Sequence, residues 1–339
     1  MEILGLSALA ALTIMLTLGF DFVNGFHDSA NSIATIVATK VLSPVYAVGM
    51  AAVFNFAGIV IGKEVAKTIG KGIIDTSLIL EYGVIMVFCA VMGAIIWDLI
   101  TWWFGIPTSS SHALVGGLIG AGGAVAFIDA IVWSGTLKTT VFIVISPIAG
   151  LIAAFLITIG VMRLARRVAR VVVNKWFRKL QIASSAFYSF THGTNDAQKG
   201  MGIIALVLLI ESGTGPSAEL IVPLWVMVAC HAAISLGTFL GGWRIVKTMA
   251  SRITKLDPYQ GFSAETGAAV MLFFTARLGI PVSTTHTISG AIMGVGATRR
   301  LSAVRWGVGR KIVIAWILTI PASATIAGCI FLGALWLGF

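Results

Sequence analysis

Charged residues are scarce in this sequence of 339 residues. Asp, Glu, Lys and Arg together make up 11% of it, whereas a typical soluble domain carries about 25%. Hydrophobic residues make up 58%, and the mean hydropathy is +0.99. A water-soluble fold cannot bury so much apolar surface in its core. The composition therefore excludes an ordinary soluble domain and predicts an all-α polytopic membrane protein.

Cysteine is also rare, since the chain has only Cys89, Cys230 and Cys329. Their number is odd, no metal-ligand spacing links them, and each lies in an apolar run. We therefore expect buried packing residues rather than disulfides or a thiolate metal site. The first apolar run has no basic n-region and no clear cleavage site, so we interpret it as a membrane span rather than a signal peptide.

Several apolar runs are long enough to cross a bilayer, which takes about 20 residues per helix. We predict six full crossings, with re-entrant segments in addition. The runs cover approximately residues 3–23, 44–62, 79–99, 139–162, 198–210 with the segment before it, 219–242 and 312–337.

The net charge of +10 is concentrated beside spans. Basic residues flank spans on the cytoplasmic side, so this pattern indicates topology and a membrane-lipid surface, not nucleic-acid binding. Segment 211–219 has no Lys or Arg, whereas 244–255 and 299–311 are basic. Residues 263–298 should then enter and leave on one face as a re-entrant hairpin, and both termini should lie outside. The densest basic cluster comprises Arg163, Arg166, Arg167, Arg170, Lys175, Arg178 and Lys179.

The chain contains an internal repeat. Gly105-Ile-Pro-Thr-Ser-Ser-Ser-His112 recurs as Gly279-Ile-Pro-Val-Ser-Thr-Thr-His286 at an offset of 174, and Gly25-Phe-His-Asp28 recurs as Gly193-Thr-Asn-Asp196 at an offset of 168. Such repeats are typical of secondary transporters, whose site lies between the two halves near the midplane. We predict two inverted-topology repeats, 1–165 and 183–339, joined by a short basic cytoplasmic linker at 166–182. Each repeat should hold about three crossings plus one re-entrant hairpin.

Polar residues spaced three and four apart mark one face of the first span, namely Asp21, Asn24, Asp28, Asn31 and Thr35. The second copy has Ser189, His192, Asp196 and Lys199 at matching positions, and Lys199 can neutralise Asp196 or contact the anion. A carboxylate at membrane depth costs about 2.5 to 3.5 kcal/mol, so it normally faces a polar interior and a partner. A stripe of structural hydrogen bonds is the alternative, but Asp28 recurs as Asp196, which favours function. Oxygen-rich side chains suit a hard coupling cation. The candidates are Asn24, Asp28, Asn31, Thr108, Asp196 and Glu265, with Na⁺ most easily held by Asp28, Asn31 and Asp196.

The Gly-Ile-Pro motif predicts a turn followed by a helix that begins among the hydroxyl residues. Free backbone N–H groups at such a helix start favour an anion. Ordinary capping by Ser or Thr is the alternative reading, but the two copies in apolar surroundings favour anion binding. The candidate phosphate-binding residues are Ser109, Ser110, Ser111, Ser283, Thr284 and Thr285, together with Asp28, Asp196, Asn195 and Gln198.

Together these motifs resemble the inorganic phosphate transporter (PiT) family. The resemblance rests on Gly25-Phe-His-Asp-Ser-Ala-Asn31, His192-Gly-Thr-Asn-Asp-Ala-Gln-Lys199 and both Gly-Ile-Pro runs. The usual first signature of the family, Gly-Ala-Asn-Asp, is here Gly-Phe-His-Asp. The resemblance implies an inverted-repeat fold, phosphate as substrate, Na⁺ or H⁺ as the driving ion, no other cofactor, and a homodimer in the cell membrane.

The prediction is therefore a symporter that imports phosphate by alternating access. Phosphate near neutral pH carries a proton and sulfate does not, so Asp28 or Asp196 can accept a hydrogen bond from phosphate alone. Two carboxylates repel an anion unless a cation arrives with it, which makes cotransport the physical expectation. The alternatives are a permease for sulfate or another tetrahedral oxyanion, a channel, and a membrane enzyme using Ser111 and His112.

Overall fold

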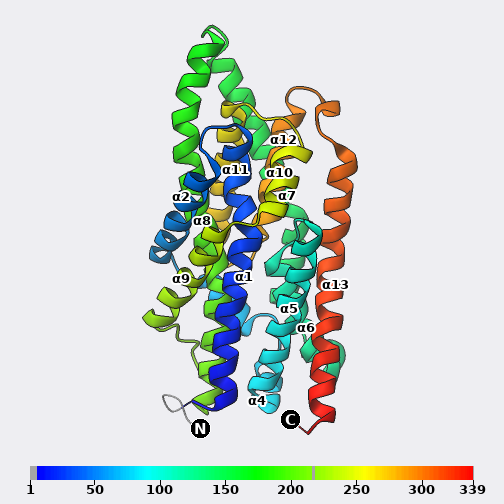
Figure 1. Cartoon of the computed structure of the whole chain (residues 1–339). Coiled ribbons are helices and arrows are strands. Elements are labelled where there is room, and N and C mark those ends of the chain that lie inside the picture. Colours follow the sequence, from blue (N-terminus) through cyan, green and yellow to red (C-terminus); the bar gives the residue numbers. More distant parts are fainter. Residues whose placement is uncertain (1–5, 216–217, 339) are drawn as a thin grey trace.

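The computed structural model describes residues 6–215 and 218–338, and within these ranges the secondary structure is helical apart from one isolated β-bridge between Ile74 and Ile131. The helices form one elongated bundle with both ends of the chain at its lower end (Figure 1). They are α1 (Ala8–Ala38), α2 (Pro44–Ala57), α3 (Glu64–Lys71), α4 (Thr76–Tyr82), α5 (Val84–Phe104), α6 (Ser110–Ala126), α7 (Trp133–Leu164), α8 (Arg170–Glu211), α9 (Leu224–Leu240), α10 (Trp243–Arg252), α11 (Pro258–Arg277), α12 (Thr284–Ala297) and α13 (Trp306–Trp336), with 3-10 turns at Gly58–Val60, Phe127–Ala130 and Leu301–Ala303.

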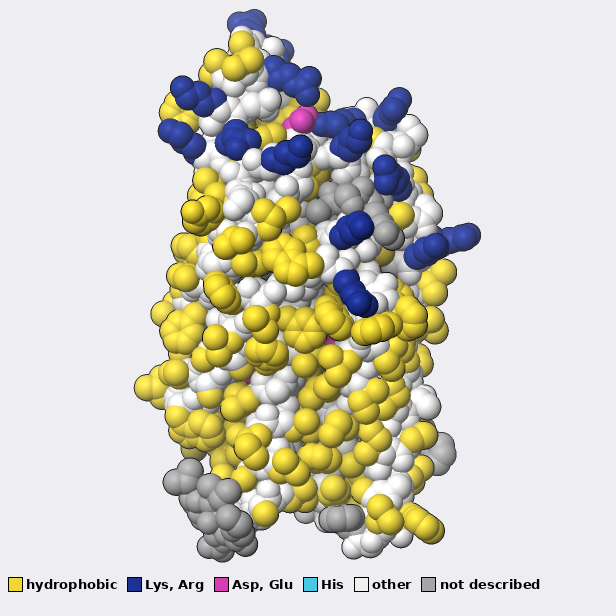
Figure 2. All heavy atoms as spheres, in the orientation of Figure 1, with side chains coloured by type: hydrophobic (Ala, Val, Ile, Leu, Met, Phe, Trp, Pro, Cys, Tyr) yellow, Lys and Arg dark blue, Asp and Glu magenta, His cyan; other side chains and the backbone are white. Residues whose placement is uncertain are grey.

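Four of the described helices, α1, α5, α7 and α13, are long and apolar enough to cross a membrane. Two bent pairs bring the number up to six if each pair is one span: α2 with its 3-10 turn meets α3 at 82°, and α9 meets α10 at 71°. The predicted span at 198–210 lies in the second half of α8, whose 42 residues also include the basic segment. The apolar side chains that these helices leave exposed cover the middle and lower part of the molecule (Figure 2).

The two longest polar-lined helices, α1 and α8, lie antiparallel. At the lower end, the hydroxyl of Ser7, the N-cap of α1, donates to Glu211 at the end of α8 (2.9 Å). At the upper end, Arg178 near the start of α8 donates to the carbonyl of Lys40, just after α1 (2.9 Å). Residues 170–182 are therefore helical, so most of the predicted linker is the first part of α8.

Two helical hairpins enter the bundle from opposite ends. Before α4 and after α6 the chain pairs with itself, because the Asp75 amide donates to the Ala130 carbonyl (2.8 Å). Before α11 and after α12, Asp257 pairs with Arg299 (2.5 Å). The hairpin α5–α6 thus opens toward the lower end of the bundle and α11–α12 toward the basic upper end (Figure 1).

Glycines at repeated positions let helices of the two predicted halves touch. A Cβ atom at Gly25 in α1 would lie 2.1 Å from the Ile234 carbonyl oxygen in α9, and one at Gly290 in α12 would lie 2.1 Å from the Pro147 oxygen in α7. Only a glycine permits such approach. The equivalent contacts are Gly193 in α8 against Asn55 in α2 and Gly116 in α6 against Ile320 in α13. The two predicted halves are therefore interlocked rather than side by side.

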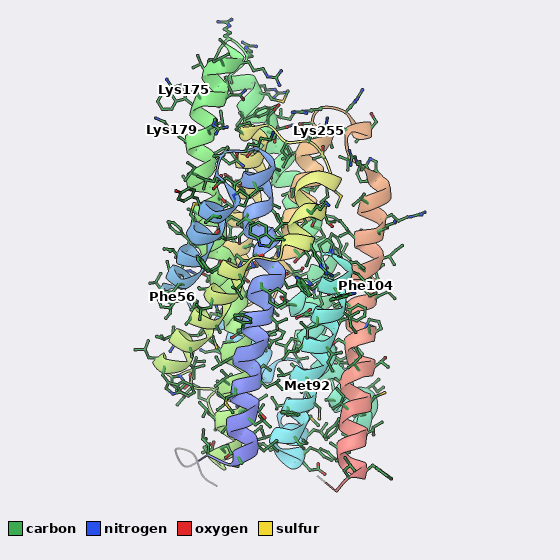
Figure 3. All side chains as sticks on the ribbon, in the orientation of Figure 1. Phe56, Met92, Phe104, Lys175, Lys179 and Lys255 are labelled. Atoms are coloured by element: carbon green, nitrogen blue, oxygen red, sulfur yellow. The ribbon has the colours of Figure 1, made fainter. Side chains whose placement is uncertain are left out.

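Basic side chains gather at the upper end of the molecule (Figure 2), where Lys175, Lys179 and Lys255 lie well above Phe56, Met92 and Phe104 (Figure 3). Among them, Arg170 pairs with Asp257 (3.2 Å). Of the cysteines, Cys89 and Cys230 are buried as predicted, but Cys329 is exposed. That prediction was wrong for Cys329 because an apolar residue of a membrane helix can face lipid instead of the protein core.

Candidate functional site

The candidate site lies where the tips of the two hairpins meet α1 and α8. The Ser111 hydroxyl of α6 donates to the Val282 carbonyl, two residues before α12 (3.0 Å). Directly behind the hydroxyls, the rings of His112 and His286 stand 4.7 Å apart. The two repeated motifs, 174 residues apart in the sequence, are therefore in contact in the fold.

Each helix starts where the Gly-Ile-Pro motif predicts. Gly105 and Gly279 have a left-handed backbone (φ +65° at both) that turns the chain back from the preceding helix. Ser109 then accepts a hydrogen bond from the His112 amide (3.2 Å), and Ser283 accepts one from the His286 amide (3.1 Å). These two hydroxyls therefore act as N-caps, which was the alternative interpretation for all six hydroxyl residues. By capping the helices they fix where both helices start, beside the site.

The remaining four hydroxyls are buried beside the two repeated aspartates, and three of them donate to an aspartate. Ser110 donates to Asn24 (2.6 Å) and approaches Asp28 (3.3 Å), while Thr285 donates to Asp28 from the other hairpin (3.3 Å). Thr284 donates to Asp196 (3.4 Å). The four are Ser110, Ser111, Thr284 and Thr285, and each is 2% exposed or less.

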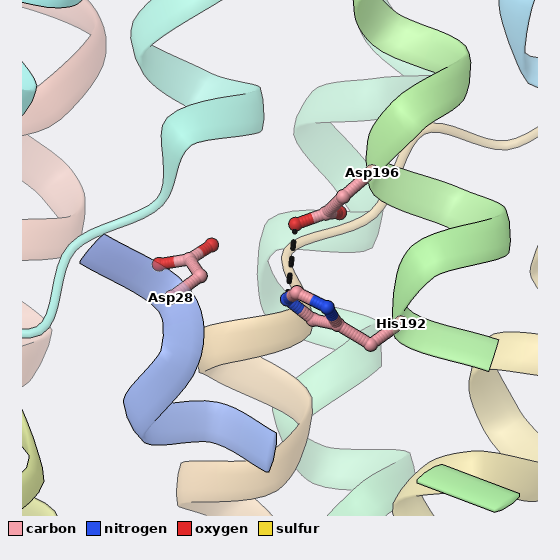
Figure 4. Close-up of side chains that lie close together, drawn as sticks. All are labelled: Asp28, His192 and Asp196. Carbon is pink, nitrogen blue, oxygen red and sulfur yellow. Dashed lines mark ion pairs between the residues drawn. The ribbon is translucent and has the colours of Figure 1, made fainter. Parts of the chain in front are cut away.

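Each aspartate has basic partners. Asp28 accepts from the neighbouring His27 (2.8 Å), and Asp196 pairs with His192 (3.3 Å) and Lys199 (3.0 Å). Ligand atoms of Asp28, His192 and Asp196 lie within 4.8 Å of one another, close enough to share a cation. Figure 4 shows Asp28 on α1 facing Asp196 and His192 on α8.

The polar face predicted for the first span is buried throughout. Asp21, Asn24 and Thr35 have no exposed surface, and Asp28 and Asn31 have 2% or less. Asn31 extends from this face to the second hairpin, where its amide nitrogen donates to Thr285 (2.9 Å) and Thr284 (3.3 Å). The site is therefore enclosed by protein, so a substrate reaches it only after a helix or hairpin moves.

Two residues predicted to bind phosphate direct their carboxamides elsewhere. The Gln198 oxygen accepts from the amides of Val65 (2.9 Å) and Ala66 (3.3 Å) at the start of α3. The amide nitrogen of Asn195 donates to the carbonyl of Leu272 in α11 (2.8 Å). Both residues hold neighbouring helices in place beside the site.

Two residues predicted for the coupling ion also lie off the central cluster. Glu265 accepts from Thr35 (2.5 Å), Ser184 (2.5 Å) and Gln181 (3.2 Å), which form a separate buried polar cluster between α1, α8 and α11. Thr108 donates to Thr101 (2.9 Å) and reaches the centre only through His27.

Three site residues were missing from the predicted ligand sets. Tyr188, with no exposed surface, donates to the Thr284 carbonyl (3.3 Å). His192 bonds Asn55 (3.2 Å). Lys199 donates to Ser110 and Ser111 (3.0 Å each). The repeat points to Lys199, which occupies the position of Asn31 and can neutralise Asp196 or contact the anion, whereas nothing in the sequence places Tyr188.

A bundle of apolar helices that encloses paired hydroxyl-rich helix starts and buried carboxylates defines a multi-pass membrane transporter. The comparison with known families agrees. A model described as "Phosphate transporter family" matches residues 24–327, and the chain belongs to this family. The resemblance found in the motifs is thereby confirmed, and the membrane-enzyme alternative is excluded because the relatives are transporters.

Similar proteins match over nearly the whole chain. A "Probable low-affinity inorganic phosphate transporter" of Rhizobium meliloti (strain 1021) is 55% identical over 95% of this chain and 95% of its own length. One of Bacillus subtilis (strain 168) is 44% identical over 94% and 95%. A solved structure, "The sodium-dependent phosphate transporter", has a TM-score of 0.88 at 26% identity and covers 98% of this chain and 100% of its own.

Proposed function

We propose that this protein is a secondary active symporter that carries inorganic phosphate across a cell membrane together with Na⁺ or H⁺. The observation that carries the proposal is the buried cluster in which hydroxyls from both hairpins contact the two repeated aspartates: Ser110 and Thr285 donate to Asp28, and Thr284 donates to Asp196. Membership of the phosphate transporter family and the sodium-dependent transporter of similar fold support the substrate and the kind of coupling.

Phosphate would bind at the two helix starts. Their backbone amides, the positive ends of the helix dipoles and the hydroxyls of Ser110, Ser111, Thr284 and Thr285 can together replace the hydration shell of the anion. Ser109 and Ser283 would act indirectly by capping the helices. Asp28 or Asp196 would accept the proton-bearing oxygen of phosphate, and sulfate, which has no such proton, would leave that carboxylate unpaired.

The coupling cation would bind on the α1 side, where oxygens of Asn24, Asp28 and Asn31 are close to the hydroxyls. Two carboxylates and an anion cannot share a buried site without positive charge. Phosphate and the cation would therefore bind cooperatively, each raising the affinity for the other. Asn31 supports this role, because its side-chain oxygen is buried with no hydrogen-bond partner.

Alternating access would follow from two inverted-topology repeats. In support, the two hairpins open toward opposite ends of the bundle while their tips meet at the site. Opening one hairpin would expose the site to one side, and opening the other would expose it to the opposite side. We place the protein in the cell membrane, with the basic end in the cytoplasm, as a homodimer.

The test is uptake of ³²P-phosphate into proteoliposomes containing the purified protein, with an inward Na⁺ gradient compared with an inward proton gradient. Uptake driven by either gradient supports the proposal and identifies the ion. If neither gradient drives phosphate and labelled sulfate accumulates instead, the substrate assignment is wrong. A flux far above carrier turnover would indicate a channel.

A further inference from the structure

The two halves of the site differ at one repeated position. With Asp28 aligned to Asp196, the residue three positions later is Asn31 in the first half and Lys199 in the second. The two side chains have corresponding places, since each extends from its aspartate-bearing helix to the hairpin of the other half. Asn31 reaches Thr284 and Thr285, and Lys199 reaches Ser110 and Ser111.

The contacts of Lys199 are those of a bound cation. Its ammonium nitrogen lies 3.0 Å from the Asp196 carboxylate and 3.0 Å from each of the Ser110 and Ser111 hydroxyl oxygens. The side chain is 1% exposed. A carboxylate and hydroxyl oxygens are also the ligands that a hard cation prefers. In this half the positive charge is part of the chain and stays in the site throughout the cycle.

The first half has the opposite arrangement. Asn31 carries no charge, and among the described residues its buried side-chain oxygen has no hydrogen-bond partner. Its amide nitrogen donates to Thr285, which in turn donates to Asp28. An amide oxygen can ligate a cation, whereas an ammonium group has no acceptor and cannot. Asp28 and Asn31 of the first half can therefore ligate an exchangeable cation, which Asp196 and His192 lie close enough to share with Asp28. In the second half, the ammonium of Lys199 already occupies the corresponding position.

We propose that Lys199 is a tethered cation that takes the place of a coupling ion in the second half, so that only the first half exchanges a cation during transport. The proposal rests on the proposed cotransport function and deepens it. It assigns the exchangeable cation to the first half of the site and the fixed ammonium of Lys199 to the second half. Substitution of Lys199 by the residue at its repeated position should then create a second exchangeable site.

The experiment compares the wild type with Lys199→Asn in proteoliposomes and in phosphate-binding assays on purified protein. Without added Na⁺, we expect K199N to bind phosphate at least about fivefold more weakly, the scale of a lost coupling between two ligands. High Na⁺ should restore binding, and the Hill coefficient of uptake for Na⁺ should rise by about one, since one more cation takes part. Retention of ²²Na⁺ by K199N above the wild-type level is a direct readout.

Three further variants make the test decisive. Lys199→Arg preserves the charge and should keep the wild-type cation dependence, whereas Lys175→Asn removes an exposed lysine at the basic end of the molecule and should change nothing. Asn31→Lys should conversely lower the Hill coefficient for the cation, which covers the case in which K199N does not fold. The proposal is overturned if none of Na⁺, Li⁺ and K⁺ restores phosphate binding to folded K199N. It is also overturned if the Hill coefficient of N31K for the cation equals that of the wild type. Failure of the wild type to move phosphate at all would instead refute the proposed function.

Discussion

Ser111 donates a 3.0 Å hydrogen bond to the carbonyl of Val282 and so joins the tips of the two hairpins. Both residues are buried, at 2% exposure each. In the proposed mechanism this contact would have to break or shift whenever one hairpin moves, because it joins hairpins that open toward opposite ends of the bundle.

Neutralising either repeated aspartate should stop transport. Asp28→Asn and Asp196→Asn each remove a buried acceptor that faces the hydroxyls, so phosphate uptake should fall about 100-fold or more. Uptake of ³²P-phosphate is the measurement, with membrane insertion checked by size-exclusion chromatography. Asp129→Asn, an exposed aspartate outside the site, is the matched control. Normal uptake by both site variants would refute their assigned roles.

Gln198 should affect stability rather than phosphate affinity. Gln198→Met removes the acceptor that serves the amides of Val65 and Ala66 and should destabilise the protein by about 1 to 3 kcal/mol. The half-saturation constant for phosphate should stay within about twofold, because the carboxamide forms its hydrogen bonds with Val65, Ala66 and Thr194. A large rise in that constant with unchanged thermal stability would restore the sequence-based assignment of Gln198 to phosphate.

Interlocking of the halves makes particular glycines intolerant of a methyl group. In Gly290→Ala the new Cβ would lie 2.1 Å from the Pro147 carbonyl oxygen, so α7 and α12 must separate. We expect a loss of about 1 to 3 kcal/mol, as for other overpacked contacts, seen as a lower Tm in detergent. Gly333→Ala in α13, where nothing lies within 4 Å, should leave the Tm unchanged or slightly raised. Equal Tm values for both variants would contradict the close approach.

Each hairpin tip is held by a threonine of the other predicted half. Thr248 donates to the Gly105 carbonyl (3.0 Å), and Thr68 donates to the Gly279 carbonyl (2.7 Å). Replacement by valine removes one hydrogen bond, worth about 1 kcal/mol, and so shifts an opening equilibrium roughly fivefold. T248V and T68V should change the half-saturation constants for phosphate on the two membrane sides in opposite directions. A shift in the same direction for both would argue against opposed gates.

The basic end should face the cytoplasm. A cysteine placed at Lys175 should react with an impermeant maleimide only from the cytoplasmic side, because basic residues are retained there. One at Leu337, at the opposite end of the bundle, should react only from outside. The background needs Cys329 replaced, because it is exposed. Labelling of position 175 from outside would reverse the proposed orientation.

Much of the architecture follows from the sequence, because hydropathy and glycine positions act locally. Apolar runs identified the spans, and the paired Gly-Ile-Pro motifs located both helix starts, since a left-handed turn at Gly105 and Gly279 depends on those residues alone. The positions of Lys and Arg beside the spans likewise predicted that basic side chains gather at one end of the molecule.

The roles of individual polar residues were harder to predict from the sequence. Ser109 and Ser110 look alike in the sequence, yet the first caps its own helix while the second faces Asp28. Gln198 and Lys199 are neighbours, and the helix geometry of α8 sends one toward α3 and the other into the site. Glu265 was assigned to the coupling ion, but its three hydrogen bonds lie in a cluster of its own.

The sequence by itself determined that this is a helical membrane protein of two related halves with a hydroxyl-rich and carboxylate-bearing motif in each, because these features depend on composition, periodicity and repetition. Only the tertiary structure decided which side chains meet. Helices of one predicted half pack against helices of the other through glycine contacts, and the site is assembled from four segments far apart in the chain. Such contacts depend on how whole helices pack, which no local pattern records.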